Sequence, residues 1–221
     1  MMFSFFEMEM LSSADINSIY FLMPADRREK FDSYRFDKDR RLCAVAYILL
    51  LYGIYSVCGK LYARVDFEYN IFGKPSLKRY PEIFFNISHC KNGVVCVLSK
   101  SEVGVDLQDI VDVDDALVKL TTSQREGEFI WQSEDRALNF TRLWACKESY
   151  LKCIGKGLNA DLPSLDFAEV DCARFYKYDK YFSLSQQHNC VLCCCTTNQY
   201  CQIEQELSVC TIRSFLELYN S

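Results

Sequence analysis

The feature that most constrains the fold of this chain is an uncharged stretch from Leu42 to Cys58. An apolar segment of this length must be buried, either in a globular core or in a membrane, and a membrane span needs about 18–20 apolar residues. The stretch falls just short of that length, contains Gly53 and Ser56, and follows the charged run Asp37–Arg41. This pattern predicts a largely buried helix over Asp39–Cys58 and disfavours a membrane span.

Composition narrows the range of partners. The chain has 221 residues, half of them hydrophobic and a quarter charged, which is typical of a globular protein with one large or two small domains. A net charge of -5 and a pI near 5.2 argue against a nucleic-acid-binding protein, which would carry a basic face. An anionic ligand would therefore need a local cluster of Lys and Arg. The segment Met1–Leu11 lacks the basic start of a signal peptide, so we expect a cytoplasmic protein.

Thirteen cysteines are an odd number and occur without signs of secretion, so we expect reduced thiols and no disulfide framework. The densest group is Cys190, Cys193, Cys194 and Cys195, and it contains one Cys-x-x-Cys pattern near His188. A zinc site would need a second pair of ligands. The same segment is equally typical of a buried strand that uses cysteine as a small hydrophobic residue, and both interpretations stay open.

Hydrophobic periodicity and turn residues predict helices, then strands, then further helices and strands. The expected helices are Ala25–Phe36, Asp39–Cys58, Asp114–Leu120, Gln124–Gln132 and Asn139–Ile154, the last ending at Gly155. The expected strands are Ile83–Ile87, Gly93–Leu98, Val103–Leu107, Leu165–Val170, Tyr181–Leu184 and Cys190–Thr196, with a turn at Phe72–Pro75 and a hairpin turn at Ser99–Glu102. This order indicates an α+β protein of two comparable halves.

The segment Val103–Gln108 is an amphipathic strand. Side chains alternate between the two faces of a strand, so Asp106 and Gln108 point together, away from Val105. Gly104 lies on the polar face, and a glycine inside a strand often marks a place where a ligand or another backbone comes close. A solvent-facing edge strand would show the same alternation, so that interpretation also stays open.

The helix Asn139–Ile154 places Trp144, Glu148 and Lys152 at i,i+4 spacing, hence on one stripe. An exposed Glu/Lys pair is commonplace on helices and is worth only ~0.3–0.5 kcal/mol. The flexible cationic loop around Lys156, which lies between two glycines, favours a functional interpretation because such a loop can approach phosphate oxygens.

The strand Phe85–His89 delivers a hydroxyl, from Ser88, and an imidazole at its carboxyl end. Cys90 follows His89 directly, which raises the alternative of a Cys/His hydrolase. Neighbours on an extended chain point apart, and catalytic Cys and His are usually distant in sequence, so the pattern disfavours that alternative.

Together these segments resemble the 4'-phosphopantetheinyl transferases of the surfactin-activating type. Three signatures of that family occur in order: Gly73-Lys74-Pro75 with Phe85–His89, then Gly104–Gln108, then Phe140–Lys152 with Gly155–Leu158. The upstream patterns Arg27–Lys30 and Asp37–Arg40 extend the resemblance to roughly residues 25–170.

The resemblance implies two similar α/β halves that form an intramolecular pseudo-dimer around a cleft. Residues 1–102 would be the half that binds coenzyme A, and residues 103–221 the half with the metal site and the long catalytic helix. Family enzymes use Mg²⁺ to transfer the phosphopantetheine group of coenzyme A to a serine of an acyl or peptidyl carrier protein, releasing adenosine 3',5'-bisphosphate. Because both halves lie in one chain, we expect a monomer, without nucleic-acid or membrane partners.

By matching positions, the resemblance implies roles for individual residues. The Mg²⁺ ligands would be Asp106, Glu148 and Gln108. Contacts to coenzyme A would come from Arg27, Lys30, Arg40, Lys74, Ser88, His89, Lys152 and Lys156. Glu148, Lys152 and His89 would be catalytic, with Glu148 as the general base.

Two positions depart from the family pattern. The family usually has glutamate where Gln108 stands, and an ungapped alignment puts Gln124 where an acid is common. A glutamine carbonyl can still coordinate magnesium, so we expect activity with altered metal affinity. Glu126 could replace the acid expected at Gln124 only if the helix register shifts. Cys90 stands where serine or a small residue is frequent, and we expect little effect.

Two other functions remain compatible with the sequence. A non-catalytic module that binds coenzyme A or a carrier protein would explain the neutral residues at both acidic positions. A metal-dependent phosphohydrolase could use the same carboxylates on coenzyme A itself.

Overall fold

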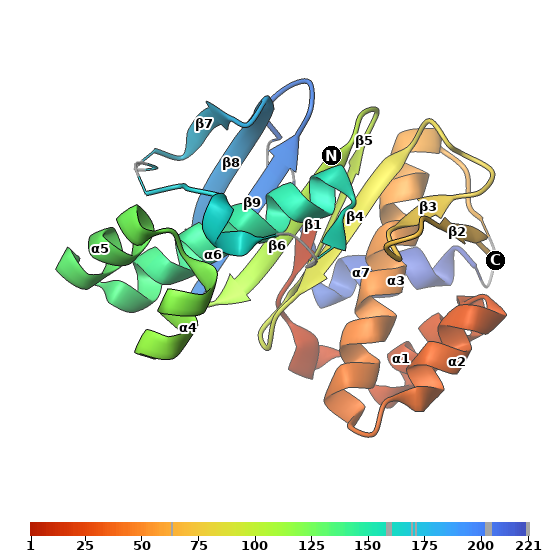
Figure 1. The fold of residues 1–221 in the computed structure, drawn as a ribbon. Coiled ribbons are helices and arrows are strands. Elements are labelled where there is room, and N and C mark those ends of the chain that lie inside the picture. The colour runs from red at the N-terminus through yellow and green to blue at the C-terminus, as the bar shows by residue number, and fades with distance from the viewer. Residues whose placement is uncertain (63, 158–160, 169, 171, 202–204, 220–221) are drawn as a thin grey trace.

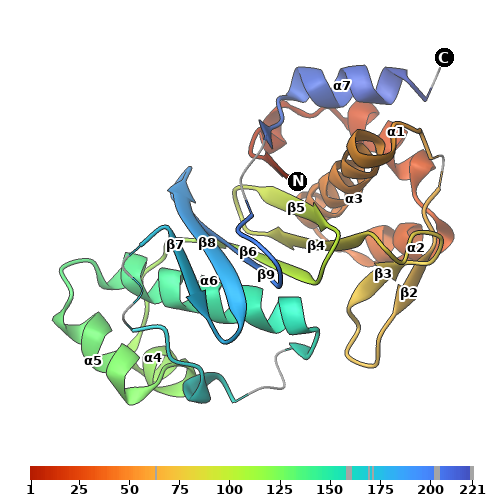
Figure 2. The ribbon, with the colours of Figure 1, turned by 90° about the horizontal axis from the view of Figure 1, so that it is seen from above.

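The structure, a computed structural model, describes residues 1–62, 64–157, 161–168, 170, 172–201 and 205–219. Two halves lie side by side, and in each half a long helix packs on an antiparallel sheet (Figures 1 and 2). The α+β class with two similar halves, predicted from the sequence, is confirmed.

The N-terminal half is built around the long helix α3 and a sheet in which β5 lies between β1 and β4, antiparallel to both. Its elements are β1 (Met2–Phe5), α1 (Ser13–Leu22), α2 (Ala25–Ser33), α3 (Asp37–Cys58), β2 (Phe67–Tyr69), β3 (Pro75–Leu77), β4 (Phe84–His89) and β5 (Val94–Ser99). Helix α3 ends at Gly59, whose left-handed backbone (φ 66°) suits glycine.

The C-terminal half repeats this arrangement. Its elements are β6 (Val103–Asp109), α4 (Asp115–Thr121), α5 (Gln124–Gln132), α6 (Arg136–Ile154), the 3₁₀ turn η3 (Leu162–Ser164), β7 (Arg174–Lys177), β8 (Lys180–Gln187) and β9 (Cys190–Thr196). In each half, three helices follow the first strand. That first strand pairs with the last one, β1 with β5 and β6 with β9, and the last strand also pairs with the strand before it, β4 or β8. Helix α6 ends at Gly155, as predicted, again with a left-handed backbone (φ 68°).

The last described segment returns to the first half. Strand β10 (Gln205–Glu206) pairs in parallel with β1, and helix α7 (Val209–Glu217) packs Ile212 and Phe215 into the N-terminal core. The boundary expected between residues 102 and 103 falls between β5 and β6, whereas residues 205–219 lie with the N-terminal half.

A separate apolar cluster joins the two sheets. Val95 and Val97 of β5 pack with Val103, Val105 and Leu107 of β6. The apolar face of β6 is therefore buried between the halves. Its polar face lies under α6, where Asp106 is 4% exposed, and this burial rules out the alternative of a solvent-facing strand.

Helix α3 is long and apolar enough to cross a membrane by length and composition alone. Its apolar side is instead buried on the sheet, where a Cβ added to Gly53 would lie 2.2 Å from Cδ1 of Leu98. The helix is thus the core helix of its half, as the sequence predicted.

The hairpin predicted at Ser99–Glu102 is wrong, because β5 and β6 belong to different sheets. Strand β5 already has a partner on each edge, so none is left for β6. The hairpin that forms is β4–β5, and its turn contains Asn92 and Gly93, a dipeptide typical of tight turns. The strand predicted over Leu165–Val170 is also wrong, because its described residues, 165–168 and 170, lie outside any strand.

A buried ion pair fixes α6 against its neighbours. Lys147 Nζ lies 2.6 Å from Glu126 Oε2 of α5, with side chains 1% and 0% exposed. Lys147 also donates hydrogen bonds to the carbonyl oxygens of Thr121 and Leu162, and Glu126 accepts one from the amide of Phe167. Burial lowers the pKa of Lys147, while Glu126 acts in the opposite direction.

Replacing Lys147 by methionine leaves the Glu126 carboxylate buried without its cation. We expect Lys147→Met to lose about 3–5 kcal/mol of unfolding free energy, measured by urea denaturation. Lys119→Met, on the exposed side of α4, is the control and should change the unfolding free energy by less than about 0.5 kcal/mol. Equal stability of the two variants would contradict a role for the pair in holding α5 on α6.

Candidate active site

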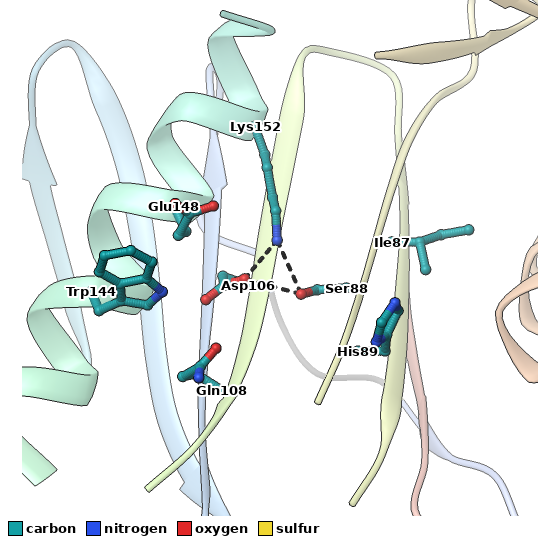
Figure 3. A pocket seen from close by; sticks show the side chains of 8 residues that line it. All are labelled: Ile87, Ser88, His89, Asp106, Gln108, Trp144, Glu148 and Lys152. Atoms are coloured by element: carbon teal, nitrogen blue, oxygen red, sulfur yellow. Dashed lines mark hydrogen bonds and ion pairs between the residues drawn. The ribbon is translucent and has the colours of Figure 1, made fainter. Parts of the chain in front are cut away.

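A pocket of about 400 Å³ opens where β4 of the N-terminal half meets β6 and α6 of the C-terminal half (Figure 3). Its lining residues are Ile87, Ser88, His89, Asp106, Gln108, Trp144, Glu148 and Lys152. The structure therefore brings the three sequence segments singled out above to one place.

Side chains join β4 and β6 across the seam between the sheets. The Asn86 Oδ1 atom accepts a hydrogen bond from the backbone amide of Val105 at 2.9 Å. Two residues further along β4, the Ser88 hydroxyl donates to Asp106 Oδ1 at 3.0 Å. Both bonds are buried, so they fix Asp106 at the seam.

Helix α6 lies directly over β6 because Gly104 has no side chain. A Cβ at Gly104 would lie 2.1 Å from the carbonyl oxygen of Ser149, so any other residue would push the helix away. The sequence expectation that another backbone comes close at this glycine is confirmed. The close packing lets Lys152 Nζ reach Asp106 Oδ1 at 2.6 Å and the Ser88 hydroxyl at 3.0 Å.

Glu148 brings a second carboxylate into the pocket from one turn earlier on α6 (Figure 3). The residue is 9% exposed, and this burial raises the pKa of its carboxyl group. The negative charge of Asp106 raises the pKa further, and the positive charge of Lys152 partly offsets the increase. A carboxylate with a raised pKa holds a proton more readily, as a general base near neutral pH must.

The donor set fits a magnesium ion. Asp106 Oδ2 and Glu148 Oε1 are both buried without a hydrogen-bond partner, and a buried unpaired carboxylate oxygen is costly. Mg²⁺ prefers oxygen ligands and commonly takes one or two carboxylates. Gln108 adds an amide oxygen at the same pocket wall. These residues could therefore hold Mg²⁺.

His89 lies at the pocket rim and is exposed as a residue, yet surrounding protein removes part of the water from its imidazole. This desolvation is the main cause that lowers the pKa of His89 from the usual 6.5, and the positive charges of Lys152 and Lys30 lower it further. The negative charges of Asp39 and Asp106 act in the opposite direction but are weaker. The ring is therefore neutral at pH 7, and an incoming anion would favour its protonation.

Several residues expected to bind coenzyme A lie outside the pocket lining. Arg27 of α2 stacks its guanidinium 4.5 Å from the ring centroid of Phe67. Arg40 donates from Nε to the carbonyl oxygen of Tyr34 at 3.0 Å. Lys30 is exposed on α2. Of these three cations, Lys30 acts on His89 and lowers the pKa of its imidazole.

Lys74 and Lys156, which were also expected to bind coenzyme A, likewise lie outside the pocket lining. Lys74 Nζ donates to the carbonyl oxygens of Val103 and Cys153, at 3.1 and 2.9 Å, so it ties the segment before β3 to the C-terminal half. Lys156 is exposed after α6. Leu158, the last residue of the third signature, lies outside the described residues.

Gln124 and Glu126 occupy different environments on α5. Gln124 is exposed and donates to Glu128, so the neutral residue there does not alter the pocket. Glu126 forms the buried pair with Lys147 and a capping box with Ser123 at the start of α5. The Ser-x-x-Glu spacing is a sequence signal that could have located this glutamate. Trp144 lines the pocket, and the i,i+4 stripe had already put it beside Glu148.

Strand β9 separates the cysteines of the Cys-x-x-Cys pattern. Cys190 faces the cluster between the sheets, whereas Cys193 faces α6, where its sulfur contacts Cys146. Two residues on opposite faces of a strand cannot chelate one ion, so the buried-strand interpretation holds for this pattern. All thirteen cysteines are described, and all are free thiols.

Two family models match the chain on either side of the junction between the halves. The model described as "4'-phosphopantetheinyl transferase, N-terminal" matches residues 11–102, and that described as "4'-phosphopantetheinyl transferase superfamily" matches residues 102–203. The chain belongs to the 4'-phosphopantetheinyl transferase superfamily.

Curated relatives agree with this family. The 4'-phosphopantetheinyl transferase gsp of Aneurinibacillus migulanus is 33% identical over 58% of this chain and 60% of its own length. The transferase psf-1 of Bacillus pumilus is 28% identical over 63% of this chain and 60% of its own length. The transferase Sfp of Bacillus subtilis is 27% identical over 65% of each chain. The matched part of this chain thus spans about 60–65% of the length of these relatives.

Glu148→Gln removes a buried charge and should stabilise the protein in magnesium-free buffer at neutral pH. The folded pKa of Glu148 is above its usual 4.5, so folding binds a proton and wild-type stability falls as pH rises through that window. The stability gain of Glu148→Gln should therefore be full above the folded pKa and vanish below about pH 4.5. The measurement is the thermal midpoint, for which 1 kcal/mol is about 2–4 °C in a chain of this size.

The control is Glu134→Gln, on the exposed surface, which should not move the midpoint. A Glu148→Gln protein no more stable than wild type at pH 7 would contradict the electrostatic cost assigned to this carboxylate.

Proposed function

We propose that the chain transfers the 4'-phosphopantetheine group of coenzyme A to a serine of an acyl or peptidyl carrier protein. The observation that carries this proposal is the pair of unpartnered buried carboxylate oxygens, on Asp106 and Glu148, in a pocket that also holds Lys152 and His89. Family membership supports it independently.

The pocket has the charges that a pyrophosphate ligand requires. Lys152 extends into it, and the neutral imidazole of His89 at the rim can gain a proton when an anion arrives. Lys30, Arg27 and Arg40, on the N-terminal half, are the proposed contacts for the distal phosphate and adenine. Lys156 is a further candidate beyond the end of α6. Lys74 would act indirectly, by holding the β2–β3 hairpin on α6.

Asp106, Glu148 and the amide oxygen of Gln108 would hold Mg²⁺. When bound, the ion supplies positive charge that neutralises the pyrophosphate of coenzyme A.

The chain's own residues would carry the transfer. The serine hydroxyl of the carrier attacks the β-phosphorus of coenzyme A, a new P–O bond forms, and the bond to adenosine 3',5'-bisphosphate breaks. Glu148, with its raised pKa, accepts the serine proton. Lys152 and His89 stabilise the charge that develops on the leaving phosphate, since phosphoryl transfer depends mainly on positioning and electrostatics.

The direct test incubates the protein with coenzyme A, Mg²⁺ and a broad panel of apo carrier proteins, and measures carrier mass. We expect a gain of one phosphopantetheine group on at least one carrier. Glu148→Gln should lower the rate by about 10²–10⁴-fold, the usual contribution of a general base. Glu134→Gln, matched in chemistry but remote from the pocket, should keep the wild-type rate.

The alternatives give different results in the same experiment. Calorimetric binding of coenzyme A without modification of any carrier would indicate a non-catalytic binding module. Breakdown of coenzyme A in the absence of carrier would indicate a phosphohydrolase. Either result would overturn the proposed transfer.

Gln108→Glu adds the carboxylate that most family members have at this position. Because Gln108 lines the pocket, we expect the variant to reach half-maximal rate at a lower Mg²⁺ concentration. Gln124→Glu makes the same chemical change on the exposed face of α5 and should leave the Mg²⁺ dependence unchanged. An equal effect of both substitutions would show that Gln108 does not act at the metal.

The proposed enzyme would work as a monomer, because one chain contributes both walls of the pocket. The proposed location is the cytoplasm. Coenzyme A and a carrier protein are the proposed partners.

A further inference from the structure

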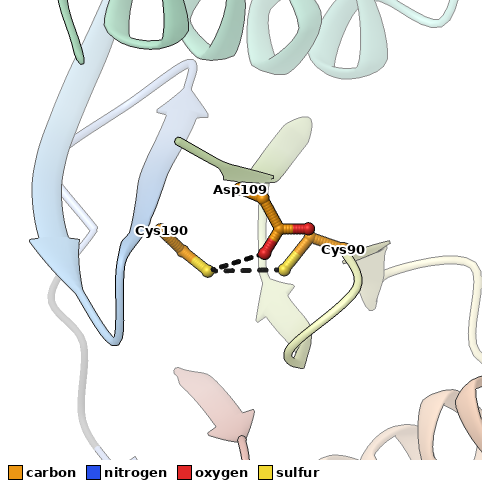
Figure 4. Close-up of side chains that lie close together, drawn as sticks. All are labelled: Cys90, Asp109 and Cys190. Carbon is orange, nitrogen blue, oxygen red and sulfur yellow. Dashed lines mark hydrogen bonds between the residues drawn. The ribbon is translucent and has the colours of Figure 1, made fainter. Parts of the chain in front are cut away.

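Outside the pocket lining, three potential metal ligands converge at the seam between the halves, two of them directly after the pocket residues His89 and Gln108 in sequence (Figure 4). They are the thiols of Cys90 and Cys190 and the carboxylate of Asp109, and their ligand atoms all lie within 4.8 Å of one another. None of the three lines the pocket.

The fold holds these side chains in place. Asp109 is directly opposite Cys190 in the β6–β9 register, so the two side chains share one face. Cys90 comes from the β4–β5 turn, and that turn also orients the carboxylate: the amide of Lys91 and the side-chain amide of Asn92 each donate to Asp109 at 2.7 Å. A ligand already oriented by hydrogen bonds is typical of built metal sites.

The distances match the edges of a tetrahedral site. With Zn–S near 2.3 Å and Zn–O near 2.0–2.2 Å, a tetrahedron has S···S and S···O edges of about 3.8 and 3.5 Å. The Cys90 and Cys190 sulfurs are 3.5 Å apart, and Cys190 Sγ is 3.5 Å from Asp109 Oδ1. The third pair, Cys90 Sγ and the Asp109 carboxylate, lies within 4.8 Å, so side-chain shifts of about an ångström or less would complete the site.

Charge and burial point the same way. Cys190 is fully buried and Cys90 is 9% exposed, whereas Asp109 reaches solvent and leaves an entry path for an ion. A thiolate, a second thiol and a carboxylate at this distance repel one another when ionised, and a divalent cation removes that repulsion.

Another thiol contact of β9, that of Cys193, lacks these features. Cys193 and Cys146 lie 3.8 Å apart between α6 and β9, both fully buried in the apolar core. The described group of three potential ligands includes neither of them. Those cysteines behave as small hydrophobic residues, whereas Cys90 and Cys190 adjoin a carboxylate.

We propose that Cys90, Cys190 and Asp109 bind a zinc ion, with water as the fourth ligand. Two thiolates and one carboxylate suit Zn²⁺ better than Mg²⁺, because soft sulfur ligands select zinc-like metals and Mg²⁺ requires oxygen. The ion would connect the turn after β4 to the ends of β6 and β9, and so tie the N-terminal half to the C-terminal half next to His89. Its role is to stabilise the junction, independently of the proposed transfer.

The test uses Co²⁺ as a spectroscopic probe of the full chain, reduced and kept anaerobic, with excess Mg²⁺ present to occupy oxygen-only sites. We expect one equivalent of Co²⁺ to produce a thiolate-to-cobalt charge-transfer band that Zn²⁺ abolishes by displacement. Zn²⁺ should also raise the thermal midpoint, since it binds the folded state. Cys90→Ser and Cys190→Ser should weaken Co²⁺ binding by at least roughly tenfold and lose most of the band. Mutating a residue that only orients a metal ligand already lowers metal affinity by about that factor, and removing the ligand itself should lower it at least as much.

Cys210→Ser is the matched control, because it removes one exposed thiol far along the chain and should keep full binding. If buried Cys190→Ser does not fold, Cys90→Ser at the turn and Asp109→Asn decide the question, and both should weaken binding. Absence of the band in wild type, or equal bands in Cys90→Ser and Cys210→Ser, would overturn the proposal. So would peptide mapping that finds Cys90 and Cys190 joined by a disulfide in the freshly purified protein.

Discussion

The contact of Asp106 with Ser88 and Lys152 is the interaction on which the site depends. It joins three elements that share no backbone pairing: β4 from one sheet, β6 from the other, and α6, which packs on β6. One oxygen of Asp106 is occupied by these donors and the other is left without a partner. The same carboxylate thus fixes the geometry of the seam and offers an acceptor to a cation.

That arrangement costs stability in the absence of a ligand. Glu148 is buried near Asp106, and both burial and the like charge raise its pKa, with only partial compensation from Lys152. Lys147, the residue before Glu148 on α6, points in a different direction, and its pair with Glu126 is in contrast fully matched by hydrogen bonds. The charge of Lys147 is therefore compensated inside the protein, whereas the negative charges of Glu148 and Asp106 at the pocket are only partly compensated. A metal ion with an anionic substrate would supply the missing compensation there.

Sequence reasoning located elements whose information is local, and failed where pairing is long-range. The bounds of α5 and β9 agree with the prediction, and the α6 stripe of Trp144, Glu148 and Lys152 lies in one pocket as expected. The hairpin after β5 was wrong because two adjacent strands look alike in sequence whether they pair or join different sheets. The metal position of Gln108 and the roles of the outlying cations stay predictions, because they depend on ligands that periodicity does not describe.

Small residues explain how the polar stripe of α6 reaches the depth of the pocket. Gly104 of β6 admits the helix backbone at one point, and on the neighbouring strand Cys193 receives a hydrogen bond from the Ser149 hydroxyl at 3.2 Å. Larger side chains at these positions would lift the helix off the sheet and withdraw Lys152 from Asp106. The cysteine content of β9 is therefore a packing requirement on the face toward α6, whereas on the opposite face Cys190 meets a carboxylate instead of a helix. Alternation along one strand gives the same residue type two different chemical environments.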